Sequence, residues 1–470
     1  MKKTRIVATV GPASDSKENM LKIVEAGVNV FRLNFSHNTH ESHKKIIDNA
    51  KEVRKEIKRP LGVLADLQGP RIRVGNAEAF EIEKGEMIFV SDQKTTDEKE
   101  LIIDSDRVAS ALQVGERIMI EDGLLRLKVV ERLENSVKAE VLNGGMVKPR
   151  KGINVPDTKL HFGAVTKKDK NDLEFAVKED VDFVALSFVS NAQEVLETRE
   201  EIKKILGRTD SLPQIVVKIE RKEAIDNIDE IIAATDVVMV ARGDLGIELA
   251  ESKVIIYQKE IIAKCLRAAK PVIVATQMLD SMINNPIPTR AEVSDVSNAV
   301  IDHTDAVMLS GESANGKYPV EAVETMAQII RDTEDSPFDD INMQYDNIIY
   351  NDYDSVINSA HDLAMTSGAK AVVLFSDAGT SARMISHHRP EQMILVATCN
   401  PKTYNQMSIV WGARSYLFEC NMHDREDMIE EVIELNKKAG RLQAGDKVVV
   451  LLGKIPGRKD VALTGIRIVE

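Results

Sequence analysis

Short, continuously apolar runs alternate with longer amphipathic stretches through residues 1–330, and this alternation limits the fold more than any other feature. Continuous rather than alternating hydrophobicity is typical of parallel strands buried on both faces. The expected strands are residues 4–10, 28–33, 61–66, 181–187, 214–219, 236–241, 271–276 and 305–309. Helix patterns lie between them, among them residues 17–26, 170–178, 194–206, 252–268 and 289–301.

Eight strand–helix pairs in succession predict a (β/α)8 TIM barrel. A doubly wound parallel sheet is the alternative, but it would need a G-x-G-x-x-G turn after the first strand. The residues at that point are Val10, Gly11, Pro12 and Ala13, which do not form such a turn. We therefore expect an α/β chain whose barrel occupies residues 1–70 and 154–335.

Residues 71–153 interrupt the barrel after its third strand. Short runs of alternating hydrophobicity, separated by turns such as Lys84-Gly85, predict a small all-β, barrel-like domain. It emerges from a βα loop, and these loops open at the functional end of a barrel. We expect this insertion to act as a lid.

A second α/β domain is expected at residues 352–470. Residues 332–351 turn acidic and aromatic, which indicates a linker before it. Strand patterns then follow at residues 371–375, 394–397, 415–418 and 448–452.

The charge of the chain excludes some classes of protein. Its 62 Lys and Arg residues stand against 75 Asp and Glu residues, a net charge of −13, so it lacks the positive field of a non-specific nucleic-acid binder. No apolar run approaches the ~18 residues of a membrane helix. The first residues lead into a strand pattern rather than a signal peptide. We expect a cytoplasmic protein without nucleic-acid or membrane partners.

Polar side chains follow the expected barrel strands at their C-terminal ends, where barrel chemistry is located. They are Arg32 and His37 after the second strand, Asp66, Arg71 and Arg73 after the third, Ser187 after the fourth, Lys218 and Glu220 at the fifth, Arg242, Gly243 and Asp244 after the sixth, Thr276 at the seventh, and Ser310 and Glu312 after the eighth. We expect these residues to share one site.

The residue types indicate the chemistry. Glu220 and Asp244 offer hard oxygen ligands suited to Mg²⁺ or Mn²⁺, although a salt-bridged pair of carboxylates is the alternative. Arg32, Lys218 and Arg73 bring positive charge to the same mouth, which predicts a phosphorylated or carboxylated small molecule as ligand. A lone histidine such as His37 is more often structural than a base.

The sequence at these strand ends resembles the pyruvate kinase family. The matching segments are TRIVATVGPAS (4–14), VFRLNFSH (30–37), DLQGPRIRVG (66–75), KGINVP (151–156), VKIE (217–220), ARGDLGIE (241–248), ATQMLDSM (275–282), PTRAEVSDVSNAV (288–300) and DAVMLSGESANGKYPVEAV (305–323). They cover the barrel in family order. The C-terminal third matches more weakly, through GTSARMISHHRP (379–390).

The resemblance implies transfer of the phosphoryl group of phosphoenolpyruvate to ADP, giving pyruvate and ATP, with Mg²⁺ or Mn²⁺ as cofactor. It implies that Glu220 and Asp244 hold the divalent ion, that Lys218 stabilises the transferring group and that Arg32 binds phosphate. The remaining implied positions are Gly243, Asp244 and Thr276 for the substrate carboxylate, Ser310 for proton delivery, and Asn34, Phe35, Ser36, His37, Arg73 and Lys151 for the nucleotide.

Two other functions remain open from the residues alone. A metal-dependent lyase or aldolase acting on oxo-acids would share the arginine and the two carboxylates, but it gives no reason for the lid or for Lys218. A non-enzymatic binding module would be expected to have lost at least one of these side chains, and all are present.

The chain departs from the potassium-dependent members of the family. They carry Glu where Arg71 stands and Thr where Leu67 stands. Because Arg71 brings its own fixed cation, we expect activity without K⁺, although the other matched monovalent ligands, Asn34, Ser36 and Asp66, are present. Arg221 replaces the Asn common after the KIE run, and the sequence gives no account of it.

The C-terminal domain resembles the family's effector-binding domain, and the family's assembly implies a homotetramer. The loop at residues 376–381 joins a strand to a helix, so its hydroxyl and N–H groups are suited to the phosphate of an allosteric effector. The alternative is an ordinary helix cap without a ligand. The expected effector residues are Ser376, Thr380, Ser381, Arg383, Arg458 and Lys459.

Overall fold

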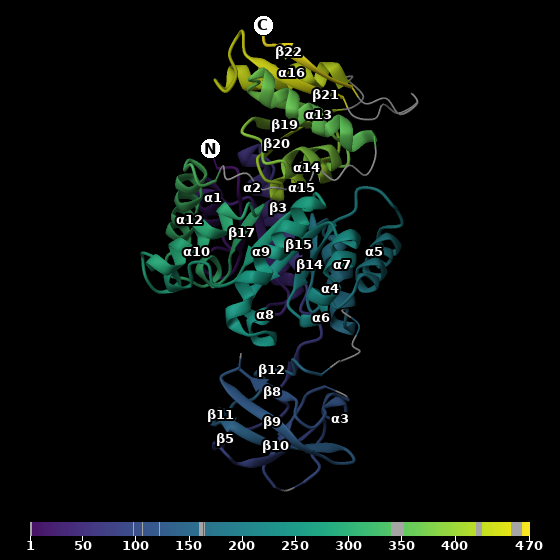
Figure 1. Ribbon diagram of the computed structural model, residues 1–470, viewed down its shortest axis with the longest axis vertical. Helices are drawn as coiled ribbons and strands as arrows, with labels where there is room; N and C mark the ends of the chain where they lie inside the picture. The colour runs from purple at the N-terminus through teal and green to yellow at the C-terminus, as the bar shows by residue number, and fades with distance from the viewer. Residues whose placement is uncertain are drawn as a thin grey trace.

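The computed structural model describes residues 2–96, 98–105, 107–121, 123–158, 163, 165–339, 352–419, 425–452 and 463–470. Three bodies are stacked along its long axis: a β domain at one end, a barrel in the middle and an α/β domain at the other end (Figure 1). Within the described ranges, no helix has the length and apolar character that crossing a membrane requires.

Eight parallel strands close into a barrel in the order β1-β17-β16-β15-β14-β13-β3-β2. They are β1 (Arg5–Thr9), β2 (Val30–Asn34), β3 (Gly62–Asp66), β13 (Phe183–Leu186), β14 (Gln214–Ile219), β15 (Val237–Ala241), β16 (Val272–Ala275) and β17 (Ala306–Leu309). Each expected apolar run forms one of these strands, which confirms the predicted (β/α)8 barrel.

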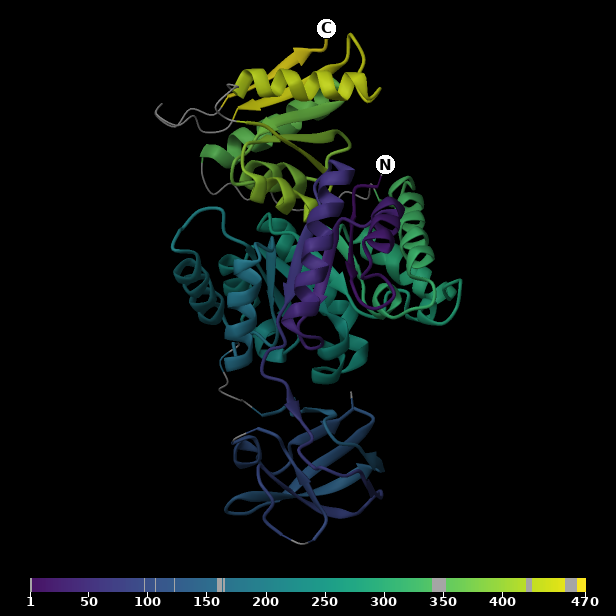
Figure 2. The ribbon, with the colours of Figure 1, turned by 180° about the vertical axis from the view of Figure 1, so that it is seen from behind.

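Helices surround the barrel, and α1, α2, α4, α5 and α10 begin at a residue whose side chain caps the helix. Thr166 and Thr289 each form a capping box with a carboxylate three residues later. The long helix α2 runs along the outside of the barrel (Figure 2). The helical elements are α1 (Lys17–Ala26), α2 (His40–Ile57), α4 (Lys167–Lys178), α5 (Ala192–Leu206), α6 (Lys222–Asp226), α7 (Ile228–Ala234), α8 (Arg242–Glu248), α9 (Glu251–Arg267), η1 (Asp280–Ile283), α10 (Arg290–Ile301), α11 (Gly311–Ala314) and α12 (Pro319–Glu334).

The inserted domain is a seven-stranded sheet in the order β4-β12-β8-β9-β10-β6-β7, with a two-stranded sheet β11-β5 beside it. A bridge between Val74 and Ile103 joins its two edges, so the larger sheet curls into a barrel-like shape. The elements are β4 (Ile72–Arg73), β5 (Phe80–Ile82), β6 (Met87–Ser91), β7 (Glu100–Ile102), α3 (Val108–Ala111), β8 (Arg117–Ile120), β9 (Leu125–Arg132), β10 (Ser136–Asn143), β11 (Gly145–Val147) and β12 (Gly152–Asn154). The one-turn helix α3 is the single helix among its described residues.

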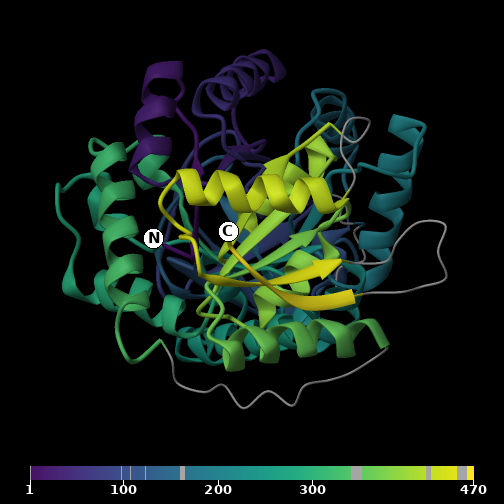
Figure 3. The ribbon, with the colours of Figure 1, turned by 90° about the horizontal axis from the view of Figure 1, so that it is seen from above.

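The C-terminal domain holds a five-stranded sheet in the order β20-β19-β18-β21-β22, with α16 on one face and α13 on the other (Figure 3). Its elements are α13 (Asp352–Ser367), β18 (Ala371–Phe375), α14 (Thr380–His387), β19 (Met393–Thr398), α15 (Pro401–Gln406), η2 (Met407–Ile409), β20 (Ala413–Leu417), α16 (Arg425–Lys438), β21 (Lys447–Leu452) and β22 (Leu463–Ile468). The sequence analysis missed β22, an antiparallel edge strand, because its residues are mostly exposed and form no continuous apolar run. Helix α12 also continues to Glu334, past the start of the expected linker, and residues 340–351 lie outside the described ranges.

The C-terminal domain plugs the N-terminal end of the barrel. Met407 and Ile409 of η2 belong to the same buried cluster as the inward-facing Val7 and Leu64 of the barrel strands. The fit is close at Gly62 in β3, where an added Cβ would lie 2.6 Å from the hydroxyl oxygen of Ser408 in η2. The N-terminal end of the barrel is therefore filled with apolar side chains, while the C-terminal end opens toward the lid.

Candidate active site

A buried carboxylate joins two cations at the C-terminal mouth of the barrel. Asp66 ends β3 and is 1% exposed. Its Oδ2 accepts a hydrogen bond from Arg32 Nε at 2.7 Å, and its Oδ1 lies 3.4 Å from Lys218 Nζ. Burial alone would raise the pKa of Asp66, but Lys218 and Arg32 hold it below its usual value. Asp66 therefore carries a negative charge that fixes both cations.

Lys218 lies in the middle of this charged cluster. Its Nζ donates a hydrogen bond to Ser187 Oγ at 2.8 Å and lies 2.8 Å from Glu220 Oε1. Burial would lower the pKa of Lys218, but Asp66 and Glu220 raise it above its usual value. The buried ammonium is therefore protonated and can face an anion.

Glu220 lies near Asp244, and the negative charges of the two carboxylates repel each other. Glu220 Oε2 accepts a hydrogen bond from Phe188 N at 2.7 Å, and its buried Oε1 lies 2.8 Å from Lys218 Nζ. Burial raises the pKa of Glu220 to about 7, Lys218 opposes the shift, and Asp244 adds to it. Asp244 lies 3.4 Å from Arg71, between its Oδ1 and the guanidinium NH2. Both carboxylates thus lie at the mouth of the barrel, each beside a cation.

The turn after β16 is strained. Thr276 and Gln277 have φ of +69° and +53°, and a β-branched residue rarely adopts this left-handed conformation. The turn allows Thr276 Oγ1 to accept a hydrogen bond at 2.9 Å from Gly243 N, in the first turn of α8. The structure therefore brings Gly243 and Thr276 together, as the resemblance led us to expect.

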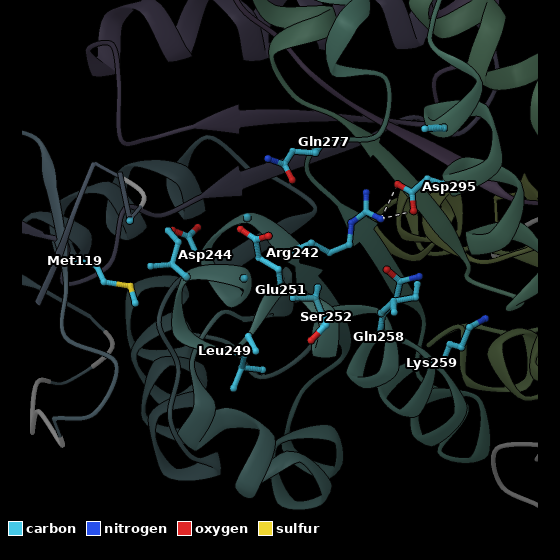
Figure 4. Close-up of a pocket in the computed structure, with 18 of the residues that line it drawn as sticks. Met119, Arg242, Asp244, Leu249, Glu251, Ser252, Gln258, Lys259, Gln277 and Asp295 are labelled. Carbon is cyan, nitrogen blue, oxygen red and sulfur yellow. Dashed lines mark hydrogen bonds and ion pairs between the residues drawn. The ribbon is translucent and has the colours of Figure 1, made fainter. Parts of the chain in front are cut away.

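Arg242 holds this turn in place and was not assigned a role from the sequence. Its NH2 donates a hydrogen bond to Thr276 O at 2.7 Å, and its NH1 forms a 2.7 Å ion pair with Asp295 of α10 (Figure 4). The sequence places Arg242 at a strand end among the residues expected to share one site, but its residue type alone indicates no such structural role. Asp295 lies within a helix, and nothing in the local sequence distinguishes it from a surface carboxylate.

The expected nucleotide residues are divided between the barrel and the lid. Asn34 Oδ1 accepts a hydrogen bond from Ser36 N at 3.1 Å, and His37 is exposed. The Phe35 ring is buried and stacks on His43 with ring centroids 4.1 Å apart, so only its backbone is available to a ligand. On the lid, Arg73 NH1 donates to Arg150 O at 2.9 Å and Lys151 Nζ lies 2.7 Å from Glu121 Oε1.

The side chain of Leu67, expected at the monovalent-ion position, is buried in the core between strands and helices. Its carbonyl oxygen accepts a hydrogen bond from Ser187 Oγ at 2.8 Å. At Ser310, which follows β17, the backbone N–H donates at 2.8 Å to Glu312 Oε2. Ser310 therefore lies at the same mouth, whereas the side chain of Leu67 points away from it.

The expected effector loop lies at the start of α14 in the C-terminal domain. Gly379 has φ of +75°, and Arg383 NH2 donates a hydrogen bond to Thr380 Oγ1 at 3.3 Å. Ser381 Oγ lies 2.5 Å from the hydroxyl of Tyr353. Arg458 and Lys459 lie outside the described residues.

Two neighbouring cavities separate the lid from the barrel. The larger has a volume of about 1270 Å³ and lies between the lid residues Arg117 and Met119 and the barrel helices α8 and α9 (Figure 4). The smaller has a volume of about 220 Å³ and reaches Arg73 and Lys151 of the lid. Asp244 lines both, so the two cavities meet at this carboxylate.

Comparisons with known proteins agree with this geometry. The family model described as "Pyruvate kinase, barrel domain" matches residues 1–323, and "Pyruvate kinase, alpha/beta domain" matches residues 354–462. The chain is 40% identical to the pyruvate kinase of Geobacillus stearothermophilus over 461 residues, which cover 96% of this chain and 78% of that protein. It is 40% identical to the pyruvate kinase of Staphylococcus epidermidis over 467 residues, covering 98% and 79%.

A solved structure leads to the same result. The crystal structure of a pyruvate kinase from Cryptosporidium parvum superposes with a TM-score of 0.91 at 33% identity, covering all of this chain and 96% of that one. Family models, curated relatives and a solved structure thus agree along the whole chain. The chain belongs to the pyruvate kinase family and transfers the phosphoryl group of phosphoenolpyruvate to ADP, giving pyruvate and ATP in the final step of glycolysis.

Proposed function

We propose that this reaction takes place at the mouth formed by Arg32, Lys218, Glu220, Asp244 and Thr276. The single observation that carries the proposal is the position of Lys218, whose ammonium lies 2.8 Å from Glu220 and 3.4 Å from Asp66. Asp66 in turn holds Arg32, so two cations face one ligand site. A cationic site held rigid before the substrate binds stabilises charge that develops on a transferring phosphoryl group.

Glu220 and Asp244 are suited to hold Mg²⁺ or Mn²⁺. Burial disfavours the charged form of Glu220, and the nearby Asp244 carboxylate repels it, so a divalent cation would relieve both costs. The described residues contain no cluster of three His, Cys, Asp or Glu side chains arranged for a metal. Two protein carboxylates suffice for Mg²⁺, which completes its coordination with water and substrate oxygens. When bound, the ion supplies positive charge beside the transferring group.

The side chains of the chain itself carry out the remaining steps. Arg32 and Lys218 bind the phosphoryl oxygens, and Gly243 N, Asp244 N and the hydroxyl of Thr276 hold the substrate carboxylate. Transfer of the phosphoryl group to a terminal phosphate oxygen of ADP leaves the enolate of pyruvate. Protonation at C3 of this enolate completes the reaction, and we assign the ordering of the proton-donating water to Thr276, with Ser310 in the same region.

Replacement of Thr276 tests this assignment. Thr276→Val keeps the shape of the side chain and removes the hydroxyl that accepts from Gly243 N. We expect exchange of the C3 protons of pyruvate with solvent, followed by NMR, to slow by about 10²-fold. Binding of phosphoenolpyruvate should weaken much less. Equal losses in exchange and in binding would remove Thr276 from the proton-transfer step.

The nucleotide is assigned to the opening between the β2–α2 loop and the lid. Asn34, Ser36, His37 and the backbone of Phe35 lie on the barrel side, and Arg73 and Lys151 on the lid side. Arg73 and Lys151 both line the smaller cavity, which supports the assignment. Cationic lid residues would then contact the phosphates of ADP after the substrate has bound.

We assign an effector role to the loop before α14, with Ser376, Thr380, Ser381 and Arg383 as its phosphate-binding residues. The left-handed Gly379 frees N–H groups at the start of α14, which supports this role. The expected cations Arg458 and Lys459 lie outside the described residues. A panel of sugar phosphates and AMP in the kinetic assay tests it, and unchanged kinetics with every compound would leave the loop as a plain cap.

A homotetramer in the cytoplasm is the assembly and location we propose. The edge strand β22 supports self-association, because Leu463, Ile466 and Ile468 are about half exposed on it. Unpaired apolar edges of this kind are suited to pairing with a second copy. Analytical ultracentrifugation tests the assembly, and a monomer at micromolar concentration would contradict it.

A further inference from the structure

Two side chains from neighbouring helices hold the backbone of the β2–α2 loop (residues 35–39), which lies between Asn34 and helix α2. Lys168 Nζ of α4 donates a hydrogen bond to Phe35 O at 2.7 Å. His43 Nε2 of α2 lies 3.0 Å from His37 O, and it must donate because this carbonyl oxygen can only accept. The shape of the loop is therefore fixed at two of its carbonyl groups.

Asp172 fixes the ammonium that holds the first of these carbonyl groups. Asp172 is 4% exposed, and its Oδ2 accepts a hydrogen bond from Lys168 Nζ at 2.6 Å. Its Oδ1 lies 2.7 Å from Nε2 of His40, the first residue of α2. One buried carboxylate on α4 thus contacts the loop through Lys168 and the helix after the loop through His40.

Ring contacts join the same segments. The Phe35 ring stacks on His43, and the ring of Phe175 in α4 stacks on His40 with centroids 4.3 Å apart. The centroids of Phe35 and Phe175 lie 6.1 Å apart, so the two stacks are neighbours. Because these rings pack α2, α4 and the loop together, removal of the Lys168 ammonium should change the loop without separating the helices.

The first turn of α4 also contacts a segment that leads into the lid. Thr166 caps α4 and forms its capping box with Asp169. Asp169 Oδ1 also accepts a hydrogen bond at 3.1 Å from Gly69 N, which lies between β3 and the lid. The start of α4 is therefore bonded to the proposed nucleotide loop and to a connection of the lid, the two parts between which we assigned the nucleotide.

We propose that Lys168 and Asp172 are positioning residues that hold the β2–α2 loop in the shape in which it receives ADP. The inference rests on the proposed nucleotide role of residues 34–37. Because Lys168 bonds to the backbone of the loop and to Asp172, away from the groups assigned to the phosphoryl group, its loss should affect the capture of ADP more than the chemical step.

Steady-state kinetics of the full chain with saturating Mg²⁺ test this proposal. For Lys168→Met and for Asp172→Ala we expect KM for ADP to rise about tenfold, since each change removes a hydrogen bond of a charged group that fixes the loop. The KM for phosphoenolpyruvate and kcat should each change less than about threefold. The double variant should be little worse than Asp172→Ala alone, because both changes release the same loop. An unchanged KM for ADP in both single variants, or fully additive effects, would overturn the proposal.

Two further variants separate this role from a general loss of structure. Lys168→Arg keeps a cationic donor and should restore most of the affinity for ADP. Lys178→Met is the matched control on the same helix, because it removes an exposed ammonium that pairs with Glu174 at 2.6 Å. It should change neither KM. A loss in Lys178→Met equal to that in Lys168→Met would contradict a specific contact with the loop.

Hydrogen exchange distinguishes failure of the inference from failure of the nucleotide assignment. The amides of residues 35–37 donate hydrogen bonds to Asp66 O or to Asn34, and Lys168→Met should speed their exchange. In the wild type, saturating ADP with Mg²⁺ should slow exchange of the same amides. If ADP leaves their exchange unchanged, the assignment of the nucleotide to this loop fails, and the rates in Lys168→Met then decide the loop contact alone. Unchanged exchange in Lys168→Met would overturn the inference even where ADP protects the loop.

Discussion

The two ends of the same eight strands are built for opposite purposes. At the C-terminal mouth, the ionisable side chains of Asp66, Lys218 and Glu220 form one cluster with little exposure to solvent. At the N-terminal mouth, Met407 and Ile409 of the C-terminal domain fill the opening with apolar side chains. One end thus gathers ionisable side chains into a cluster, and the other removes apolar surface from water.

The ion pairs at the two ends of the barrel also differ. Around the plugged end, Arg389 pairs with Asp305 at 2.9 Å, and Lys402 contacts Asp180 at 2.5 Å. These pairs match one cation with a nearby carboxylate. At the open end Asp66 contacts both Arg32 and Lys218, and Lys218 also contacts Glu220, so the charges form one shared cluster. We therefore expect a variant at the open end to lose activity before stability. A variant at the plugged end should lose stability before activity.

The largest expected effect is at Lys218. Lys218→Met should lower kcat by about 10³-fold or more, because the charge facing the transferring phosphoryl group is lost. Binding of Mn²⁺ should be retained. The matched control is Lys402→Met, which removes a buried lysine at the plugged end and should lower the melting temperature with little change in kcat. A near-normal kcat for Lys218→Met would remove this lysine from the mechanism.

A variant in the apolar plug should lose stability and keep its activity. Ile409 is 1% exposed, and Ile409→Ala should lower the free energy of unfolding by about 2–5 kcal/mol through the lost burial and the cavity left behind. Chemical denaturation measures this change, and kcat at a temperature where the variant is folded should match the wild type. A large loss of kcat in the folded variant would show that the two ends are not independent.

The histidines at the plugged end predict an acid-sensitive interface. Burial lowers the pKa of His387 to about 4 and that of His388 to about 3, below the value of about 6.5 expected when unfolded. Between about pH 6.5 and 4 the unfolded chain therefore binds more protons than the folded chain. The contribution of the two histidines to stability is present above pH 6.5 and is lost as the pH falls. The variant with His387→Asn and His388→Asn should show a shallower fall in melting temperature across this range.

The matched control for that prediction is His37→Asn, because His37 is exposed at the open end. Its pH profile should follow the wild type. If the double variant also follows the wild-type profile, the two histidines do not account for acid sensitivity at the plugged end.

The smallest expected effect concerns K⁺. Arg71 brings a fixed cation to Asp244 at the open end, so activity in buffer free of K⁺ and Na⁺ should stay within about twofold of activity with K⁺. The coupled assay with and without K⁺ measures the ratio. A strict requirement for K⁺ would mean that the arginine does not replace the ion.

The sequence predicts the barrel well and the remainder less completely. Strands such as β15 (Val237–Ala241) are continuously apolar and fully buried, so periodicity alone locates them. Strand β22 lies at a sheet edge, where exposure removes the pattern. The site follows the same rule. Lys218 and Glu220 are predictable because they end strands, whereas the partnership of Arg242 with Asp295 depends on packing between α8 and α10, more than 50 residues apart.

The affinity for Mn²⁺, measured by titration calorimetry on the wild type, Glu220→Gln, Asp244→Asn and the double variant, tests the central claim most directly. If one divalent ion binds both carboxylates at the open mouth, each single change should abolish most of the binding and the second should add little. Wild-type affinity in either single variant would contradict a shared ion, and with it the assignment of phosphoryl transfer to this cluster.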